Sequence, residues 1–309
     1  MVKSILINFL SNLGDTIVSL PALDRLKTNY PDSKITAIAS LKTKTFLLEN
    51  NFIDEVILYN KLWPWGQKLK FVLDLRGKYD LMIDLKNTFL PVALGVRKST
   101  SFVRKFPKGM HAKDEVLSLI AKVAPKEARL KSELILEESK KKNLESLKLK
   151  KSVFIACSSR EKLKQYPYEY LKVVVSELIA KHSVAILGVA KDRDFYKDIL
   201  YFPGVIDLVG KTEMNEVYFL LKNYVDLLLC VDSSIMHLAS YLDLPIVALF
   251  GHSDPVRYGP WSAKYSVLQK NKYMAPSSAQ RKQNYQVLLK RMEIEPEQVL
   301  KAIEKTIGK

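Results

Sequence analysis

An apolar run near residue 230 ends in one acidic and two hydroxyl side chains at the expected start of a helix, a place where an anion can bind. The run Leu227–Val231 stops at Asp232-Ser233-Ser234, and a helix-like pattern that carries His237 starts directly afterwards. Free N–H groups and the positive dipole end at a helix start attract anions. We therefore expect a site for a phosphorylated ligand here. The alternative is that Asp232 or Ser233 only caps the helix and His237 packs against the sheet, because Ser and Asp are common N-cap residues.

A second acidic residue follows the first apolar run of the chain. Asn12-Leu13-Gly14-Asp15 stands between Ile5–Phe9 and an apolar helix pattern. Gly14 permits a tight turn that brings the backbone close to a ligand, and Asp15 presents its carboxylate at the mouth of the helix. A plain N-cap is the alternative for Asp15, because acids near a helix N-terminus are stabilising and common.

The loop after the apolar run Val153–Ala156 combines hydroxyl groups with cations. Ser158 and Ser159 are followed by Lys162 and Lys164. Hydroxyls and flexible ammonium groups are suitable partners for a diphosphate. A basic surface loop explains Lys162 equally well. Lys164 is the stronger candidate for a diphosphate contact.

Several familiar sites are missing from the sequence. There is no G-x-x-x-x-G-K-[ST] loop and no G-x-G-x-x-G fingerprint, and the whole chain has 11 glycines. The absence of these motifs argues against a nucleotide kinase and against a nicotinamide-dependent dehydrogenase. The four histidines show no ligand spacing with Cys157 and Cys230, so we expect no metal site. Two cysteines do not suggest a disulfide framework, and a reducing cytoplasm fits them.

The amino-acid composition limits the classes of protein and partner that are possible. The chain has 309 residues, of which 48% are hydrophobic and 27% are charged, as in a soluble globular protein of two domains. Its 49 Lys and Arg against 33 Asp and Glu give a net charge of +16. This charge favours nucleic acid, an anionic membrane or a phosphorylated substrate without choosing among them. No apolar stretch approaches the roughly 20 residues of a membrane-spanning helix. We expect a soluble or peripheral protein that is not exported.

The elements that must position these residues follow one repeating pattern. Short apolar runs alternate with helical patterns along the chain, which is typical of βα units and predicts the α/β class with largely parallel sheets. The expected strands are Ile5–Phe9, Ile35–Ala39, Val56–Tyr59, Leu81–Leu85, Val153–Ala156, Val184–Leu187, Val205–Leu208, Leu227–Val231 and Ile246–Phe250. Ligands of such sheets bind at the carboxyl ends of strands, so the loops after Phe9, Ala156 and Val231 should carry the site.

The domain boundary is expected in a polar, Lys-rich stretch that runs from Glu137 to Lys151 and suits an exposed connection. It predicts an N-terminal domain of residues 1–145 and a C-terminal domain of residues 146–295. Helices are expected at Ile17–Tyr30 and Phe71–Lys78. Pro296 opens a last helix, residues 296–309, which could pack back on the N-terminal domain.

The stretch from Lys61 to Lys70 mixes two tryptophans with several lysines, including Lys68. Such a stretch can hold an anionic partner or a sugar. Partly buried aromatics beside solvated lysines are the more frequent explanation.

Taken together, these motifs resemble the lipopolysaccharide heptosyltransferase family, glycosyltransferases that use ADP-heptose. The resemblance rests on segments that occur in the family's order and spacing: Leu13-Gly14-Asp15 with Pro21, Lys164-Gln165-Tyr166-Pro167, Asp232-Ser233-Ser234-Ile235-Met236-His237 and Gly251-His252-Ser253-Asp254-Pro255. It implies the GT-B fold, in which two Rossmann-like domains face each other across a cleft. The N-terminal domain would bind the acceptor and the C-terminal domain the nucleotide sugar.

The resemblance also implies roles for individual residues. Asp15 matches the family's catalytic base, with Asn12 and Gly14 in its supporting loop. The donor-binding positions are Ser158, Ser159, Lys164, Met214, Asp232, Ser233, Ser234 and His237, with Met214 as an adenine contact. A phosphorylated, lipid-linked saccharide acceptor would meet the basic residues Lys61, Lys68, Arg97, Lys98, Arg104 and Lys105. This contact would take place at the cytoplasmic face of the inner membrane, where the protein would be peripheral.

The function implied is an inverting transfer of heptose from ADP-heptose to the lipopolysaccharide inner core, with no metal or other cofactor invoked. One position departs from the family, which usually has Gly where Ser234 stands. One alternative is therefore a glycosyltransferase that uses another nucleotide sugar for capsule or glycolipid synthesis. Another alternative is a basic nucleic-acid-binding α/β protein, although the sequence has no recognition module and its acids at strand ends would repel phosphates. A third is a relative that binds nucleotide sugar without turnover.

Overall fold

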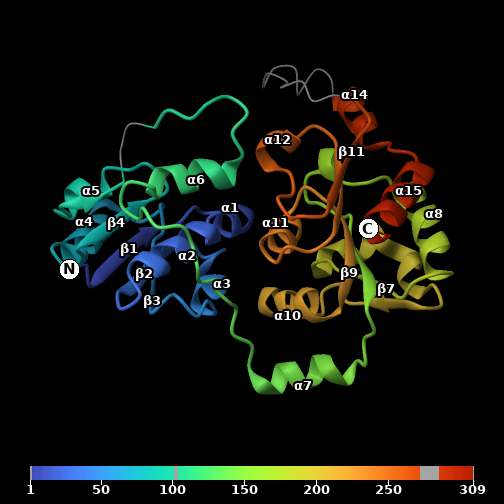
Figure 1. Cartoon of the computed structure of the whole chain (residues 1–309), viewed down its shortest axis with the longest axis horizontal. Coiled ribbons are helices and arrows are strands. Elements are labelled where there is room, and N and C mark those ends of the chain that lie inside the picture. The colour runs from blue at the N-terminus through green and yellow to red at the C-terminus, as the bar shows by residue number, and fades with distance from the viewer. Residues whose placement is uncertain (1, 101–103, 272–284, 309) are drawn as a thin grey trace. The chain divides into compact units, whose positions relative to one another are not determined.

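The fold was taken from a computed structural model, which describes residues 2–100, 104–271 and 285–308. The chain divides into two compact units, Met1–Ile135 and Leu136–Lys309. Figure 1 shows the first unit in blue to green and the second in green to red. Each unit is built on one parallel sheet, which confirms the expected α/β class.

The first unit holds, within its described residues, a sheet of five parallel strands in the order β3-β2-β1-β4-β5. The strands are β1 (Ser4–Asn8), β2 (Lys34–Ala39), β3 (Glu55–Leu58), β4 (Leu81–Asp84) and β5 (Lys98–Ser99). β1, β2 and β4 are continuous apolar runs because helices cover both faces of the sheet, so their side chains are buried on either side. The two-residue β5 was not expected from the sequence.

The helices of the first unit differ from the expected ones in a way that concerns Asp15. They are α1 (Leu13–Val18), α2 (Leu20–Asn29), α3 (Lys44–Leu48), α4 (Trp65–Leu75), α5 (Leu90–Ala93) and α6 (Ala112–Ile120). The single helix predicted over Ile17–Tyr30 is two helices, because Pro21 lacks an amide hydrogen and its ring crowds the carbonyl four residues earlier. Asp15 therefore stands on a separate short helix directly after β1.

α4 and α5 share one core with the face of the sheet that they cover. The buried members of this core are Leu6, Ile38, Phe71, Leu75, Met82 and Leu94. The helix predicted over Phe71–Lys78 ends at Leu75, because Gly77 has a φ of 71°, a left-handed conformation that suits glycine.

The second unit has, among the residues described, six parallel strands in the order β11-β10-β9-β6-β7-β8. They are β6 (Ser152–Ala156), β7 (Val184–Ile186), β8 (Val205–Asp207), β9 (Val225–Val231), β10 (Ile246–Phe250) and β11 (Tyr265–Gln269). β11 lies at the edge of the sheet and is only partly buried, so its short run gave no strong apolar signal. β6, β9 and β10 are neighbours, which brings the loops at their carboxyl ends together.

The second unit's longest helices are α8 (Tyr168–Ile179), α10 (Met214–Tyr224) and α15 (Pro296–Ile307). Shorter segments are α7 (Glu138–Ser146), η1 (Lys162–Lys164), η2 (Ala190–Asp192), α9 (Arg193–Tyr196), η3 (Lys197–Tyr201), α11 (Ser234–Tyr241), α12 (Pro255–Tyr258), α14 (Tyr285–Leu289) and η4 (Lys290–Met292). Val299, Ala302 and Ile303 of α15 belong to the core of the second unit, and packing of this last helix on the N-terminal domain stays a prediction. Their spacing of three and four residues forms one apolar face that the second unit's own sheet buries.

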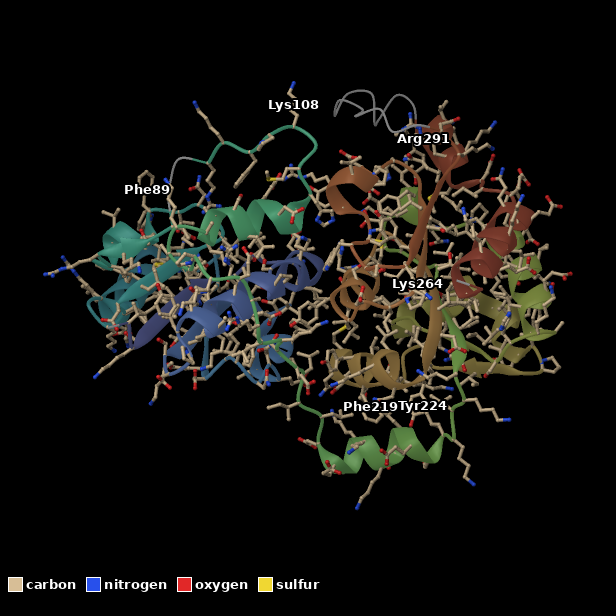
Figure 2. All side chains as sticks on the ribbon, in the orientation of Figure 1. Phe89, Lys108, Phe219, Tyr224, Lys264 and Arg291 are labelled. Atoms are coloured by element: carbon tan, nitrogen blue, oxygen red, sulfur yellow. The ribbon has the colours of Figure 1, made fainter. Side chains whose placement is uncertain are left out.

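The division between the units falls between Ile135 and Leu136, earlier than the boundary expected after residue 145. The Lys-rich stretch expected as a connection forms α7, which packs beside α10 and is tied to it by an ion pair between Lys140 and Glu213. Figure 2 shows Phe219 and Tyr224 on the side of α10 that lies toward α7. These contacts assign the helix to the second unit.

Candidate active site

The clearest cluster of polar groups lies at the carboxyl edge of the second unit's sheet. The loops after β6, β9 and β10 meet there because these three strands are neighbours. Each loop carries side chains singled out in the sequence. The contacts among these loops come from residues far apart in the chain, so the fold and not the local sequence brings them together.

An ion pair joins the loop after β6 to the loop after β9. Lys164 Nζ lies 2.7 Å from Asp232 Oδ2, and the two side chains are 25% and 7% exposed. A buried carboxylate needs such a partner, since an unpaired buried charge is costly. An ammonium group has three donor hydrogens, and this contact uses one. The pair therefore fixes Lys164 at the end of the sheet without using all of its hydrogen-bonding capacity.

The start of α11 lies directly after Asp232. Ser233 is its N-cap, and the Ser233 hydroxyl accepts a hydrogen bond of 3.4 Å from the Met236 amide. Ser234 is the first residue of the helix and is half-buried. The capping alternative thus describes what the Ser233 side chain does in this structure. It leaves the positive end of the helix dipole beside the Lys164–Asp232 pair.

His237 lies one turn inside α11, next to the acid that precedes the helix. Its ring is buried and stacks on Trp261, with ring centroids 5.8 Å apart and planes 20° apart. Its Nε2 atom lies 3.9 Å from Asp232 Oδ1. The structure therefore brings Lys164, Asp232 and His237 into one cluster.

A second close contact in the same region joins residues that were not among the expected site residues. His252 Nε2 lies 2.9 Å from Glu161 Oε1, and His252 is buried. Glu161 directly precedes η1, the segment that carries Lys164, and His252 follows β10. The motif that begins at Gly251 pointed to His252 in the sequence, but nothing in the local sequence indicated that Glu161 would contact it.

Gly251 explains why the loops can approach so closely. A Cβ atom at this position would lie 2.7 Å from Met292 Sδ and 2.8 Å from the Leu163 carbonyl oxygen. Real Cβ atoms do not come this close, so a side chain would push η1 away from the end of β10. The glycine thus sets the position of the segment that holds Lys164.

The hydroxyls after β6 are anchored through a buried tyrosine. The Tyr196 hydroxyl accepts hydrogen bonds from the amides of Cys157 and Ser158 at 3.1 and 3.2 Å, and donates to the Leu187 carbonyl. Burial raises the pKa of Tyr196, so its proton stays in place at neutral pH. The Ser159 hydroxyl accepts from the Glu161 amide at 3.2 Å. Both serines are half-buried at the edge that carries Lys164.

Met214 stands apart from this cluster. It begins α10, on the connection between β8 and β9, and is half-buried. Its helix start is held by a capping box between Glu213 and Glu216. The contacts described above do not link Met214 to Lys164 or Asp232.

In the first unit, Asp15 is held by a local contact. The side-chain amide of Asn12 donates a hydrogen bond to Asp15 Oδ2 at 3.1 Å, and Asp15 is half-buried in the first turn of α1. Gly14 lies within α1 and has no positive φ, so the turn expected to need glycine freedom is ordinary helix. The Ser19 hydroxyl donates to the Asp15 carbonyl at 2.8 Å, which closes the short helix.

A second acid stands at the same edge of the first unit's sheet and was missed. Asp84, the last residue of β4, is buried. It accepts hydrogen bonds from the side-chain amide of Asn8 at 2.8 Å and from the Thr88 hydroxyl at 3.0 Å. Arg104 donates to the backbone carbonyls of Asp84 and Leu85. Burial lowers the pKa of Arg104, and the charge of Asp84 opposes this shift. These bonds give Asp84 a structural role in holding the loop after β4.

The remaining basic candidates of the first unit are spread over several elements. Arg97 and Lys98 lie at the amino edge of the sheet, where Lys98 pairs with the first residue of β4 and donates to the Tyr30 hydroxyl at 2.9 Å. Lys105 and Lys61 are exposed. Lys68 Nζ lies 5.8 Å from the centroid of the Trp65 ring. Of these six cations, Arg104 is the one bonded to the carboxyl end of β4.

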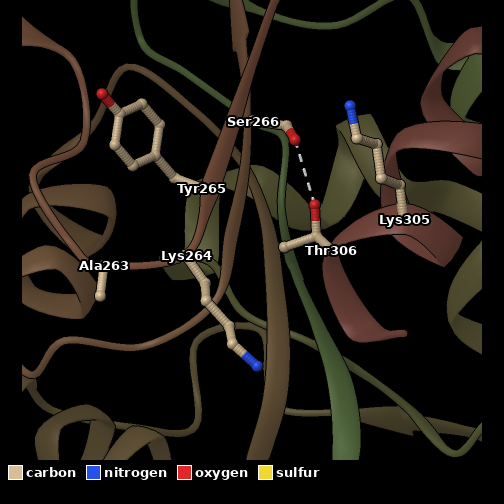
Figure 3. A pocket seen from close by; sticks show the side chains of 6 residues that line it. All are labelled: Ala263, Lys264, Tyr265, Ser266, Lys305 and Thr306. Carbon is tan, nitrogen blue, oxygen red and sulfur yellow. Dashed lines mark hydrogen bonds between the residues drawn. The ribbon is translucent and has the colours of Figure 1, made fainter. Parts of the chain in front are cut away.

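A cavity of about 180 Å³ lies elsewhere in the second unit, between the start of β11 and the end of α15 (Figure 3). Tyr265 pairs with the first residue of β10, so this cavity is at the amino edge of the sheet, opposite to Lys164. The Ser266 and Thr306 hydroxyls are 3.1 Å apart across it. Lys264 and Lys305 point away from each other in Figure 3, so they do not form a converging anion site.

Two kinds of feature are absent from the described residues. None of the described helices is long and apolar enough to span a membrane. In the same part of the chain, no group of three or more His, Cys, Asp and Glu side chains is arranged to hold a metal ion.

The chain was compared with known proteins. Residues 69–288 match the model of glycosyltransferase family 9 (heptosyltransferase). The matched range includes every donor-binding candidate and leaves out Asp15. Among curated proteins, lipopolysaccharide heptosyltransferase 3 of Escherichia coli is 24% identical over 286 residues, covering 81% of this chain and 84% of that protein. Lipooligosaccharide heptosyltransferase 2 of Haemophilus influenzae is 25% identical over 297 residues, covering 83% and 86%.

Solved structures agree in fold. The ADP-heptose lipopolysaccharide heptosyltransferase II of E. coli aligns with a TM-score of 0.76 at 22% identity, covering 99% of this chain and 98% of that one. A family 9 glycosyltransferase from Veillonella parvula aligns with a TM-score of 0.82 at 22% identity, covering 99% and 97%. These alignments agree with the expected GT-B fold. The family match spans more than half of the chain, and so this protein belongs to glycosyltransferase family 9, the heptosyltransferase family of lipopolysaccharide core biosynthesis, and is a glycosyltransferase.

Proposed function

We propose that this enzyme transfers heptose from ADP-heptose to the lipopolysaccharide inner core, with inversion at the anomeric carbon. The observation that carries the proposal is the Lys164–Asp232 ion pair of 2.7 Å at the start of α11. Fixed cations and helix N-termini stabilise charge where it develops in a transition state. In this reaction, negative charge develops on the diphosphate of the departing ADP.

The chemical step is a direct displacement. An acceptor hydroxyl oxygen forms a bond to the anomeric carbon while the bond from that carbon to the diphosphate oxygen breaks, and ADP leaves with the electron pair. The Asp15 carboxylate takes the proton of the attacking hydroxyl. The Asn12 amide, which donates to Asp15 Oδ2 at 3.1 Å, orients that carboxylate. A positioned base of this kind contributes about 10²–10⁴-fold to the rate.

The donor is bound by the loops of the second unit. Lys164 keeps its bond to Asp232 and directs its other N–H groups at the diphosphate, where charge-assisted hydrogen bonds are strong. Ser158 and Ser159 add hydroxyl donors. The remaining donor contacts in the proposal are Ser233, Ser234, His237 and the adenine contact Met214. No metal ion or other cofactor is invoked.

The acceptor is proposed to be an anionic, lipid-linked saccharide at the cytoplasmic face of the inner membrane, where the enzyme is peripheral. Its phosphate groups would meet the basic residues of the first unit: Lys61, Lys68, Arg97, Lys98, Arg104 and Lys105. The net charge of +16 supports an anionic partner of this kind. Nucleic acid is not proposed as a partner.

The donor is tested by a thermal-shift screen with ADP-, UDP-, GDP- and CMP-linked sugars. A ligand that binds only the folded state raises the free energy of unfolding, and with it the melting temperature. The gain is about 2.7 kcal/mol when the ligand concentration is one hundred times the dissociation constant. The proposal expects the largest shift with ADP-heptose. An equal or larger shift with a UDP-, GDP- or CMP-sugar would contradict the donor assignment.

Ser234 favours a second candidate, a glycosyltransferase that uses another nucleotide sugar for capsule or glycolipid synthesis. Ser234 is the first residue of α11 and half-buried, at the position where the resembling family usually has Gly. Its side chain occupies space that a donor phosphate could otherwise approach. Calorimetry of the Ser234→Gly variant with the same four donors separates the candidates: a changed donor order supports the second one, and unchanged affinities remove Ser234 from donor choice.

A further inference from the structure

A stripe of large apolar side chains on α4 is exposed to solvent. Trp65 is 85% exposed, Leu69 58% and Leu73 57%, and Leu62 just before the helix is 80% exposed. Folded proteins leave single apolar residues exposed without consequence, but a contiguous apolar patch indicates a binding surface. Four large side chains within twelve residues make such a patch.

The spacing shows that the stripe is a second apolar face of the helix. Trp65, Leu69 and Leu73 follow each other at four-residue intervals, which places them on one side of an α-helix. Phe71 and Leu75 of the same helix are buried against the sheet. The stripe is therefore not needed for the core of the first unit.

The surroundings of the stripe are basic. Between Lys61 and Lys78 the chain has five cations and Asp74 as its one acid, a net charge of +4. Lys61, Lys70 and Lys78 are exposed, and Lys68 Nζ lies 5.8 Å from the centroid of the Trp65 ring. A helix face that combines Trp and Leu with flanking lysines is the composition of helices that lie in a membrane interface.

The neighbouring α5 adds to the exposed apolar area. Phe89 is 83% exposed and Val92 66%, and Figure 2 labels Phe89 in the first unit. α5 shares its core with α4, and the Gly77 amide just after α4 donates to the Leu94 carbonyl at 3.1 Å. The two helices therefore form one covering layer on the sheet.

We propose that the exposed side of α4, extended by α5, docks on the surface of an anionic lipid bilayer. The inference deepens the proposed function and rests on it for the location of the lipid-linked acceptor. Trp65, Leu69 and Leu73 insert at the level of the headgroups, where Trp is favoured, and the lysines contact anionic lipid phosphates. A protein partner would need complementary acids, and a second copy of this chain would bring two basic faces together. Charge complementarity thus selects the anionic bilayer.

The experiment uses the full chain and sedimentation with vesicles. Vesicles of phosphatidylglycerol and phosphatidylethanolamine are compared with vesicles of phosphatidylcholine, at low and high salt. We expect binding to the anionic vesicles that weakens steeply with salt. The triple variant W65S/L69S/L73S should bind these vesicles at least about tenfold more weakly, because the inserted apolar area is lost.

The charge contribution has a matched control. K70E/K78E should weaken binding to anionic vesicles severalfold. K150E/K151E makes the same change of charge at exposed positions outside α4 and should have a clearly smaller effect. The single variant Trp65→Gln, measured alongside, preserves the test if the triple variant does not fold. Equal effects of the two charge pairs, or vesicle binding by the triple variant equal to that of the unaltered chain, would overturn the proposal.

Two further outcomes are distinguished by the same samples. The unaltered chain could fail to bind vesicles and sediment as a dimer, with the W65S/L69S/L73S variant as a monomer. In that case a second copy covers the stripe and the proposal is wrong. Vesicle binding requires neither donor nor acceptor. A chain that binds anionic vesicles but transfers no heptose would thus refute the proposed function and keep this inference, and heptose transfer without vesicle binding would do the reverse.

Discussion

The two units hold their candidate residues in different ways. In the second unit, Lys164 and Asp232 come from loops 68 residues apart and are joined by a 2.7 Å ion pair. In the first unit, Asp15 in α1 is held by a hydrogen bond from the side-chain amide of Asn12, the N-cap residue of the same helix. The second unit therefore has a preorganised ion pair between two loops, and the first unit presents a carboxylate oriented by local contacts. The difference teaches that the proposed donor site rests on contacts that the fold makes between distant loops, whereas the proposed base rests on one local contact.

The largest expected effect concerns the first unit. Asp15→Asn should lower the rate of sugar transfer by about 10²–10⁴-fold, because the amide cannot accept the proton of the acceptor hydroxyl. Affinity for the nucleotide sugar, measured by calorimetry, should stay unchanged, since the proposed donor contacts belong to the second unit. Turnover close to that of the unaltered enzyme would remove Asp15 from its proposed role.

Asp84 and Asp232 both stand at the carboxyl end of a strand and should behave differently. Asp84→Ala removes the acceptor of the Asn8 and Thr88 hydrogen bonds, and each buried group left unsatisfied costs about 1–3 kcal/mol. We expect a lower free energy of unfolding by urea denaturation, with donor affinity kept. Asp232→Ala should lower donor affinity with less loss of stability, because Lys164 is partly exposed. If Asp84→Ala lowered donor affinity and Asp232→Ala caused the larger loss of stability, the roles assigned to the two acids would be wrong.

Two glycines test how tightly each unit is packed. Gly251→Ala places a Cβ atom 2.7 Å from Met292 Sδ, and overpacking of this kind costs about 1–3 kcal/mol. Donor affinity should fall as well, because η1 carries Lys164. Gly66→Ala is the control: it lies in α4 with nothing within 4 Å of the added atom, and should stabilise by about 0.5–1 kcal/mol. Equal changes in urea denaturation would contradict the described packing.

The smallest expected effect is a pH dependence in the second unit. Hydrogen bonds from Lys172 and Tyr168 lower the pKa of Asp198 to about 2. A carboxyl group with a depressed folded pKa stabilises the fold above its unfolded pKa of about 3.9 and loses this contribution as the pH falls toward the folded value. The stability difference between the unaltered chain and Asp198→Asn should therefore be small at pH 7 and shrink between pH 4 and pH 2. A difference that grows on acidification would contradict the ion pair.

The expected strands are the part of the fold that the sequence predicted best. The runs at Leu227–Val231 and Ile246–Phe250 are continuous and apolar because both faces of their sheet are covered. β11 was missed because an edge strand with half-buried residues lacks that signal. The place of Pro21 was known, but its effect of splitting one helix into α1 and α2 was not anticipated.

The candidate site was predicted less completely than the strands. Asp232, Lys164 and Asp15 stand out because each follows a buried strand, where ligands of parallel sheets bind. The Glu161–His252 and Asn8–Asp84 contacts were not foreseen, since each joins residues from separate loops or strands. Such pairs depend on the order of strands in the sheet, which local patterns do not specify.

The central claim, a donor site organised by Lys164, is tested most directly by calorimetry of ADP-heptose with two variants of η1. Lys164 is bonded to Asp232, whereas Lys162 is exposed two residues earlier on the same segment. Lys164→Ala should weaken donor binding by about tenfold to one hundredfold, since hydrogen bonds to charged groups are worth about 1.5–3 kcal/mol. Lys162→Ala should leave it nearly unchanged. Equal affinities for the two variants would contradict the proposed donor site.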